Sequence, residues 1–244
     1  MRKFCLLFCL FFSLYAEENK AHVGLCIMAT GCYNAYATKF IQSCRKHFLN
    51  NHQVTYYVFT DGEVENAPDV VKVHQERLGW PFDTMMRFEV FAKQETLYKD
   101  LDYLYASDAD MLFVADVKNE ILSDLVGTMH PGFISKRGTY ETNPKSSACV
   151  NPDEGTLYFA GGFYGGRKEN VLTLWKTCGK NVNQDLKQEY VALWHDESHI
   201  NRYFIDHFPT HVLTPAYCCP ESQKLPFSVK LLALDKNHEA MRQL

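Results

Sequence analysis

The sequence lacks several features that would point to a particular class of protein. Its 25 lysine and arginine residues are fewer than its 29 aspartate and glutamate residues, and the formal net charge is −4. Nucleic-acid-binding domains usually carry a basic excess, so we expect no nucleic acid among the partners. The sequence contains no repeat, no low-complexity tract and no long block of one charge. With 46% hydrophobic and 22% charged residues, it has the composition of an ordinary globular domain.

The nine cysteines form no pattern that indicates a metal site or a disulfide framework. No two of them stand in C-x-x-C spacing, which argues against structural zinc. Cys5 and Cys9 lie in an N-terminal apolar run, and the rest of the chain contains an odd number of cysteines. An odd number cannot pair completely within one chain, so we expect isolated buried thiols. The sequence also has no N-x-S/T glycosylation acceptor.

One long apolar run is present, at the N-terminus. Two basic residues precede an apolar stretch from Phe4 to Tyr15, and a polar segment follows. This order is typical of a secretory signal peptide. As a helix the stretch would be roughly 20 Å long, whereas a bilayer core is about 30 Å thick. We expect residues 1–20 to form a signal-like or short hydrophobic segment that exports the chain or holds it at a membrane, the cytoplasmic face included. Residues 21–244 are expected to form one domain.

Strand and helix patterns alternate through the first 110 residues. Short β-branched or apolar runs predict strands at 23–30, 54–60, 70–74 and 101–106. Apolar residues at helical spacing predict helices at 34–48 and 84–99. This alternation predicts an α/β sheet with parallel strands, which binds ligands at the carboxyl ends of its strands. No linker interrupts the chain, although the second half is more irregular.

The sharpest chemical signal is Asp108-Ala109-Asp110, which directly follows the last of these expected strands. In extended backbone the two aspartates project to the same side. Two carboxylates at a strand end are costly unless a positive charge lies between them, and hard divalent cations prefer such oxygen ligands. The pattern favours a metal site over two solvated turn residues because of its position after a buried strand.

Two further segments allow more than one interpretation. His195 and His199 stand four apart with acids between them, which raises the alternative of a zinc-dependent hydrolase. However, Asp196 follows the first histidine, and Asp196 or Ser198 as a helix N-cap would leave His195 outside the helix. In residues 158–166, two glycine pairs among aromatics indicate either tight turns in a sheet or close approach of backbone to a ligand.

These segments, together with others, resemble glycosyltransferase family 6, the family of the histo-blood-group A and B transferases and the α1,3-galactosyltransferase. The matching stretches cover roughly residues 24 to 244 in family order. They are His47-Phe48, Tyr56–Asp61, Met86–Glu89, Asp108–Met111, Gly127–Phe133, Thr139–Glu141, Asp153–Gly155, Gly161–Gly166, Trp194–His199 and Lys236–His238. The resemblance implies a glycosyltransferase A-type fold, with a mixed, mainly parallel sheet between helices in a single catalytic domain.

The resemblance also implies roles for individual residues. Asp108 and Asp110 match a manganese-binding pair, so Mn²⁺ or another divalent cation is the expected cofactor. Glu197 matches the glutamate beside the anomeric carbon and is the expected catalytic residue. Donor contacts are implied for Met28, Ala29, Thr30, Tyr33, Arg87, Asp108, Ala160, Gly161, Gly162, His195, Asp196, Lys236 and Arg242. Acceptor contacts are implied for His130, Thr139, Trp194, Asp196 and Glu197.

The implied reaction moves GalNAc or Gal with retention from a UDP donor, in α1,3 linkage, to a galactoside-type acceptor on an oligosaccharide or glycolipid. UDP leaves poorly unless positive charge compensates it, which Arg87, Lys236 and a metal on the aspartates would supply. Glycine at 162 leaves room for an acetamido group and favours UDP-GalNAc. The family's acceptor-contacting aspartate falls at Pro220 or Glu221 here, so the acceptor stays open. A sugar-binding relative that has lost transfer is the non-enzymatic alternative.

Overall fold

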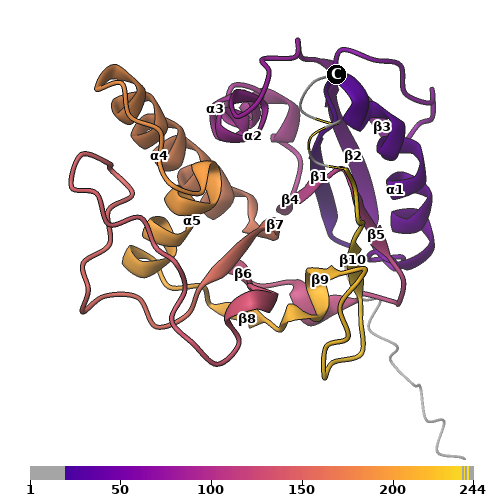
Figure 1. Ribbon diagram of the computed structural model, residues 1–244. Helices are drawn as coiled ribbons and strands as arrows, with labels where there is room; N and C mark the ends of the chain where they lie inside the picture. Colours follow the sequence, from indigo (N-terminus) through magenta and orange to yellow (C-terminus); the bar gives the residue numbers. More distant parts are fainter. Residues whose placement is uncertain (1–19, 238, 240, 242–244) are drawn as a thin grey trace, which may run out of the picture.

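The computed structural model describes residues 20–237, 239 and 241. A seven-stranded sheet, in the order β3-β2-β1-β4-β7-β6-β8, runs through its centre (Figure 1). The strands are β1 His22–Met28, β2 Gln53–Thr60, β3 Val70–His74, β4 Tyr103–Asp108, β6 Leu125–Met129, β7 Phe159–Arg167 and β8 His211–Leu213. Strands β1 to β4 are mutually parallel, whereas β7 runs antiparallel to both β4 and β6. The predicted single-domain α/β fold with a mixed, mainly parallel sheet is confirmed.

Helices and a second, smaller sheet surround this frame. The helices are α1 Asn34–His47, α2 Phe82–Met85, α3 Arg87–Ala92, α4 Lys168–Lys187 and α5 His195–Asp206. Short 3₁₀ turns are η1 Gly31–Tyr33, η2 Glu95–Tyr98, η3 Asn119–Ile121, η4 Pro131–Phe133 and η5 Pro215–Tyr217. The small sheet has the order β5-β10-β9, from Met111–Phe113, Leu231–Ala233 and Cys219–Pro220. It joins the segment after β4 to the C-terminal part of the chain.

Two apolar cores lie on opposite faces of the large sheet. Helix α1 presents Ala37, Phe40, Ile41 and Cys44, whose spacing of three and four residues places them on one side. They pack on one face together with alternate residues of β1, such as Leu25. On the other face, α3, α4 and α5 pack around Trp175. Figure 1 shows α1 on one side of the sheet and α4 and α5 on the other. Because both faces are covered, β1 is apolar along nearly its whole length.

One sequence expectation about local structure is wrong, and one of two alternatives for the glycine-rich segment is excluded. The helix predicted over 84–99 is three short pieces, α2, α3 and η2, because the helical path breaks at Met86 and again after Ala92. The glycine-rich segment 158–166 forms no pair of tight turns; most of it belongs to the continuous strand β7. Its glycines allow close packing: a Cβ on Gly165 would lie 2.2 Å from the ring of Tyr105. All seven described cysteines are free thiols; four of them are buried as expected, whereas Cys32, Cys149 and Cys218 are partly exposed.

The N-terminal segment expected at residues 1–20 lies almost entirely outside the described residues. Among the residues that are described, no helix combines the length and apolar character needed to cross a membrane. The predicted export or membrane attachment therefore stays a prediction.

Candidate active site

The topology of the sheet brings three chain segments to one edge. Met28 at the end of β1 pairs with Asp108 at the end of β4. Strand β7 runs antiparallel to β4, so its beginning, with Gly161 and Gly162, lies at the same edge as these strand ends. Carboxyl ends of parallel strands are where α/β sheets bind ligands. Two cavities open at this edge.

The two cavities are parts of one cleft because they share Asp108, Asp110, Gly162, Glu197 and Lys236. The first cavity is lined in addition by Met28, Thr30, Tyr33, Trp80, Asp83, Thr84, Arg87, Ala109, Gly161, Trp194, His195 and Asp196. The second is lined in addition by Met111, His130, Ala160, Cys218, Pro220, Ser222, Ala233, Leu234 and Asp235. Charged groups therefore stand at the junction of the two cavities, and aromatic side chains line the first.

Arg87 is the buried cation of the cleft. Its Nη1 donates to Asp108 Oδ1 at 2.7 Å and its Nη2 donates to Asp196. The side chain is only 6% exposed, and Asp196 on α5 is 4% exposed. Burial works to lower the pKa of Arg87, but the carboxylates of Asp196 and Asp108 outweigh it and the pKa is raised. Arg87 therefore stays charged and links β4 to the start of α5.

Lys236 supplies a second cation from the C-terminal part of the chain. Its ammonium group contacts the Asp110 carboxylate and lies 5.0 Å from the centre of the Tyr33 ring. The small sheet holds this segment in place, since β10 pairs with β5 directly after Asp110. The amide of Leu234 also donates to the carbonyl of Asp110. Each aspartate of the D-x-D pair therefore faces one basic group across the cleft.

Glu197 stands at the junction of the two cavities, in the first turn of α5. Its Oε2 accepts a hydrogen bond from the amide of Gly161 at 3.0 Å. Burial, the largest cause, raises the pKa of Glu197 to about 7, although the Gly161 amide acts in the opposite direction. Asn201, one turn later, exchanges two hydrogen bonds of 2.8 Å with the backbone of Phe159. This contact fastens α5 to β7 and so fixes the glutamate beside the glycines.

The carboxylate pair fits a divalent cation. Asp108 and Asp110 line the same cleft, and the Asp108 side chain is 40% exposed, so one carboxylate is accessible from solvent. Within the described residues, no group of three or more histidine, cysteine, aspartate or glutamate side chains converges as a metal site. The protein would therefore contribute two oxygen-donor side chains, leaving the other positions to phosphate oxygens and water, as is usual for hard cations at diphosphates.

Most of the expected site residues meet in this cleft. Of the implied donor contacts, Ala29 does not reach it: the residue is fully buried in the core between β1 and α1. His130 lines the second cavity, and burial lowers its pKa to about 4. Thr139 lies exposed on the loop of residues 134–157 and lines neither cavity. Arg242 lies outside the described residues.

Several lining residues were missed by the sequence reasoning. Trp80 packs edge-on against the ring of His195, with 4.7 Å between the ring centres. Asp83 accepts a hydrogen bond from Thr30 Oγ1 at 3.2 Å. Cys218 lines the second cavity. The turn-forming Gly79-Trp80-Pro81 sequence was a usable signal for an exposed aromatic, whereas nothing in the sequence places Cys218.

The arrangement does not fit the zinc-hydrolase alternative. His195 lines the first cavity, but His199 is 1% exposed and its Nε2 lies 3.7 Å from Asp185 of α4, outside the cleft. His195 also has a positive φ of 50°, so the two imidazoles do not share a regular helical face. The expectation of Asp196 or Ser198 as N-cap is wrong, since α5 begins at His195. The Ser198 hydroxyl instead accepts from the amide of Trp194 at 2.9 Å.

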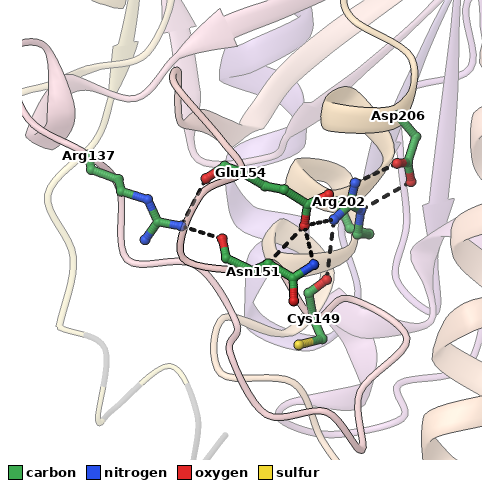
Figure 2. A network of polar contacts seen from close by, with 6 residues as sticks. All are labelled: Arg137, Cys149, Asn151, Glu154, Arg202 and Asp206. Atoms are coloured by element: carbon green, nitrogen blue, oxygen red, sulfur yellow. Dashed lines mark hydrogen bonds and ion pairs between the residues drawn. The ribbon is translucent and has the colours of Figure 1, made fainter.

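The loop of residues 134–157 beside the cleft is fastened to α5 by side chains. Figure 2 shows Arg202 of α5 between Glu154 of the loop and Asp206 of its own helix. Arg202 Nη1 donates to Glu154 at 3.0 Å, and Glu154 also accepts from the amide of Asn151. Arg137 donates to the carbonyls of Asn151 and Glu154. The loop thus has its own polar network in place of strands.

Comparison with known proteins identifies the family. The model of glycosyltransferase family 6 matches residues 10–243. Histo-blood group ABO system transferase 1 of Rattus norvegicus is 37% identical over 237 residues, covering 90% of this chain and 68% of the relative. Globoside alpha-1,3-N-acetylgalactosaminyltransferase 1 of Mus musculus is 32% identical, covering 90% and 67%. O-antigen biosynthesis glycosyltransferase WbnI of Escherichia coli is 27% identical, covering 89% and 96%. The chain therefore belongs to glycosyltransferase family 6 and is a retaining hexosyltransferase.

Proposed function

We propose that the protein transfers GalNAc, or Gal, from its UDP-sugar in α1,3 linkage to a galactoside-type acceptor, and that the reaction depends on a divalent cation, Mn²⁺ in particular. The family uses nucleotide-sugar donors and glycan acceptors, and its enzymes are generally metal-dependent. One observation supports the proposal above all others: a single cleft joins the Asp108 and Asp110 carboxylates, the cations of Arg87 and Lys236, and Glu197.

Charge compensation of the leaving diphosphate is the first task of such a site. Asp108 and Asp110 would hold the divalent cation, which supplies positive charge to the diphosphate when bound. Arg87 is fixed between two carboxylates and adds a permanent charge beside them. Lys236 can exchange Asp110 for a phosphate oxygen, since both are anionic acceptors for its ammonium group. Arg87 and Lys236, which we propose to bind the donor diphosphate, thus form ion pairs with carboxylates of the protein itself.

Stabilisation of the reacting carbon is the second task. An oxocarbenium-like centre develops as the glycosidic bond to UDP weakens, and a nearby carboxylate stabilises it. Glu197 is the proposed group, because it stands where the cavity with Arg87 meets the cavity with His130. We propose that the donor sugar occupies the junction and that the acceptor enters from the second cavity, past His130, with Trp194 of the first cavity bordering the junction beside Glu197. Retention follows from transfer on the same face or through Glu197 itself.

The choice of donor sugar rests on Gly162. GalNAc carries an acetamido group at C2, where Gal carries a hydroxyl. Gly162 lines both cavities, and the methyl group that it lacks leaves space for the larger substituent. UDP-GalNAc is therefore the proposed donor. In Gly162→Ala, the ratio of kcat/KM for UDP-GalNAc to that for UDP-Gal should fall by about 10- to 200-fold.

The test is a UDP-release assay with both donors and an array of oligosaccharide acceptors. Transfer of GalNAc to a galactoside in the presence of Mn²⁺ would support the proposal, and linkage analysis of the product would establish α1,3. Thr173→Ala, on the exposed face of α4 and away from the cleft, is the control and should leave the donor ratio unchanged. A wild-type preference for UDP-Gal would contradict the donor assignment, and binding without transfer would favour a sugar-binding protein.

A further inference from the structure

Cys218 lines the cleft but has no role in the proposed mechanism. It lines the second cavity together with Asp108, Gly162 and Glu197. The chain on both sides of it is held firmly. The amide of Cys218 donates to the carbonyl of Pro215, the first residue of η5, and Cys219 begins β9 and pairs with Leu232 of β10. The backbone therefore fixes the direction of the thiol.

The thiol faces Gly162. A Cβ atom placed on Gly162 would lie 3.3 Å from Cys218 Sγ, 3.4 Å from Asp108 Oδ2 and 3.7 Å from Met111 Cε. The space that this glycine leaves open is therefore bounded on one side by the thiol and on another by a carboxylate of the proposed metal pair. Burial is the largest cause that raises the pKa of the Cys218 thiol.

We propose that Cys218 is a specificity-determining residue whose thiol contacts the C2 substituent of the transferred sugar and, with Gly162, sets the size of that substituent. This inference rests on the proposed donor site at the junction of the cavities. A polarizable thiol at this distance from Gly162 is suited to pack against an acetamido methyl group. An acetamido group placed over Gly162 would make its next contact with the side chain of Cys218.

Cys219 provides a matched control beside it. Its side chain is 1% exposed, and its thiol points to the carbonyls of Pro220 and Gln223. It lines neither cavity. Substitution of either cysteine removes the same atoms, but only Cys218 faces the proposed sugar.

The first experiment measures the initial rate at which methyl methanethiosulfonate modifies Cys218 in the full-length protein, by mass spectrometry of the peptides, at a mildly alkaline pH and over a time course long enough for this high-pKa thiol to react without donor. With Mn²⁺ present, UDP-GalNAc should slow the modification at least about ten-fold more than UDP alone, because only the sugar covers the thiol. Half-buried Cys149, on the loop of residues 134–157, is the internal reference and should react equally in both. Equal protection of Cys218 by UDP and UDP-GalNAc would overturn the proposal.

The second experiment is a double-mutant cycle of Cys218→Ala and Gly162→Ala, read as kcat/KM for UDP-GalNAc. The added methyl of Gly162→Ala meets the thiol, so removal of the thiol should restore activity in that background. The two effects should depart from additivity by about five-fold or more. The cycle of Cys219→Ala with Gly162→Ala should be additive. Cys218→Leu should lower kcat/KM for UDP-GalNAc about ten-fold more than for UDP-Gal.

The outcomes separate this inference from the proposed donor. If the protein uses UDP-Gal, the GalNAc assignment fails, whereas protection by UDP-Gal and coupling between the two positions would still support Cys218 as a wall of the sugar site. If UDP-GalNAc is preferred but Cys218 and Gly162 act additively, the inference about Cys218 fails and the donor assignment stands.

Discussion

The two sides of the cleft are built in different ways. On the side of the first cavity, Met28, Asp108 and Gly162 are carried by strands whose backbones pair in one sheet. The loop of residues 134–157 lines neither cavity itself and borders the other side through contacts such as that of Glu141 with the amide of Leu193. It contains no regular strand, and side chains such as Arg202 and Glu154 hold it to α5 (Figure 2). Backbone pairing fixes positions with little dependence on side-chain identity, whereas a side-chain network changes with a single substitution. Positions on the paired strands should therefore depend little on neighbouring side chains, and we propose that the loop, which carries Thr139, is the part where acceptor preference can change.

The largest loss of activity is expected at Glu197, in the first turn of α5 beside the start of β7. Glu197→Gln preserves the shape of the side chain and an oxygen for the Gly161 amide but removes the negative charge. Because that charge acts mainly as positive charge builds on the sugar, kcat should fall on the order of 10²- to 10³-fold while KM for the donor changes little. Steady-state kinetics with calorimetric UDP binding would measure this. An unchanged kcat would place catalysis on another residue.

The next effect concerns the carboxylate pair. Asp108→Asn or Asp110→Asn should lower turnover on the order of 10²-fold, since each 1.36 kcal/mol of lost charge stabilisation is tenfold in rate. Asp100→Asn, an exposed aspartate in the segment before β4, is the matched control and should retain full activity. Excess EDTA should abolish transfer by the wild type, and added Mn²⁺ should restore it. Full activity in EDTA would contradict metal dependence.

A smaller effect is expected for a substitution that loosens the loop of residues 134–157. It should change the KM for the acceptor and not the KM for the donor. Arg202→Ala removes the contacts to Glu154 and Asp206 of a side chain that is only 13% exposed. Loss of charged hydrogen bonds of this kind costs about 1–3 kcal/mol of stability. We expect KM for the acceptor to rise several-fold and KM for the donor to stay the same. Kinetics with each substrate varied separately, together with thermal unfolding, would check this.

The control for the loop is an exposed ion pair. Lys176→Ala removes a contact to Glu95 between two side chains that are about half exposed, which should cost at most about 1 kcal/mol. Neither Michaelis constant should change. If Arg202→Ala raised the KM for the donor as much as the KM for the acceptor, the loop would influence both substrates and the proposed division would be contradicted.

The difference between strand pairing and side-chain contacts also determines which parts of the fold and of the site could be predicted from the sequence. The parallel strands could be predicted because buried strands are apolar along their length, and D-x-D stood out by following such a strand. The break of the helix at Met86 was not predictable, since residues 84–99 keep a helical apolar pattern through it. Arg202 with Glu154 and Cys218 with Gly162 are contacts between residues 48 and 56 positions apart. Only tertiary structure brings such pairs together, so a local pattern contains no sign of them.

The pairing of β10 with β5 has a consequence for synthesis of the protein. Asp110 meets Lys236 only after 126 further residues have been made and β10 has docked beside β5. A nascent chain can therefore form β1, β2 and β4 with Arg87 available to Asp108 but with no partner yet for Asp110. During that interval the charge of Asp110 is screened by ions from the surrounding solution. A segment made more than a hundred residues later thus completes the charge balance of a site whose lining begins at Met28.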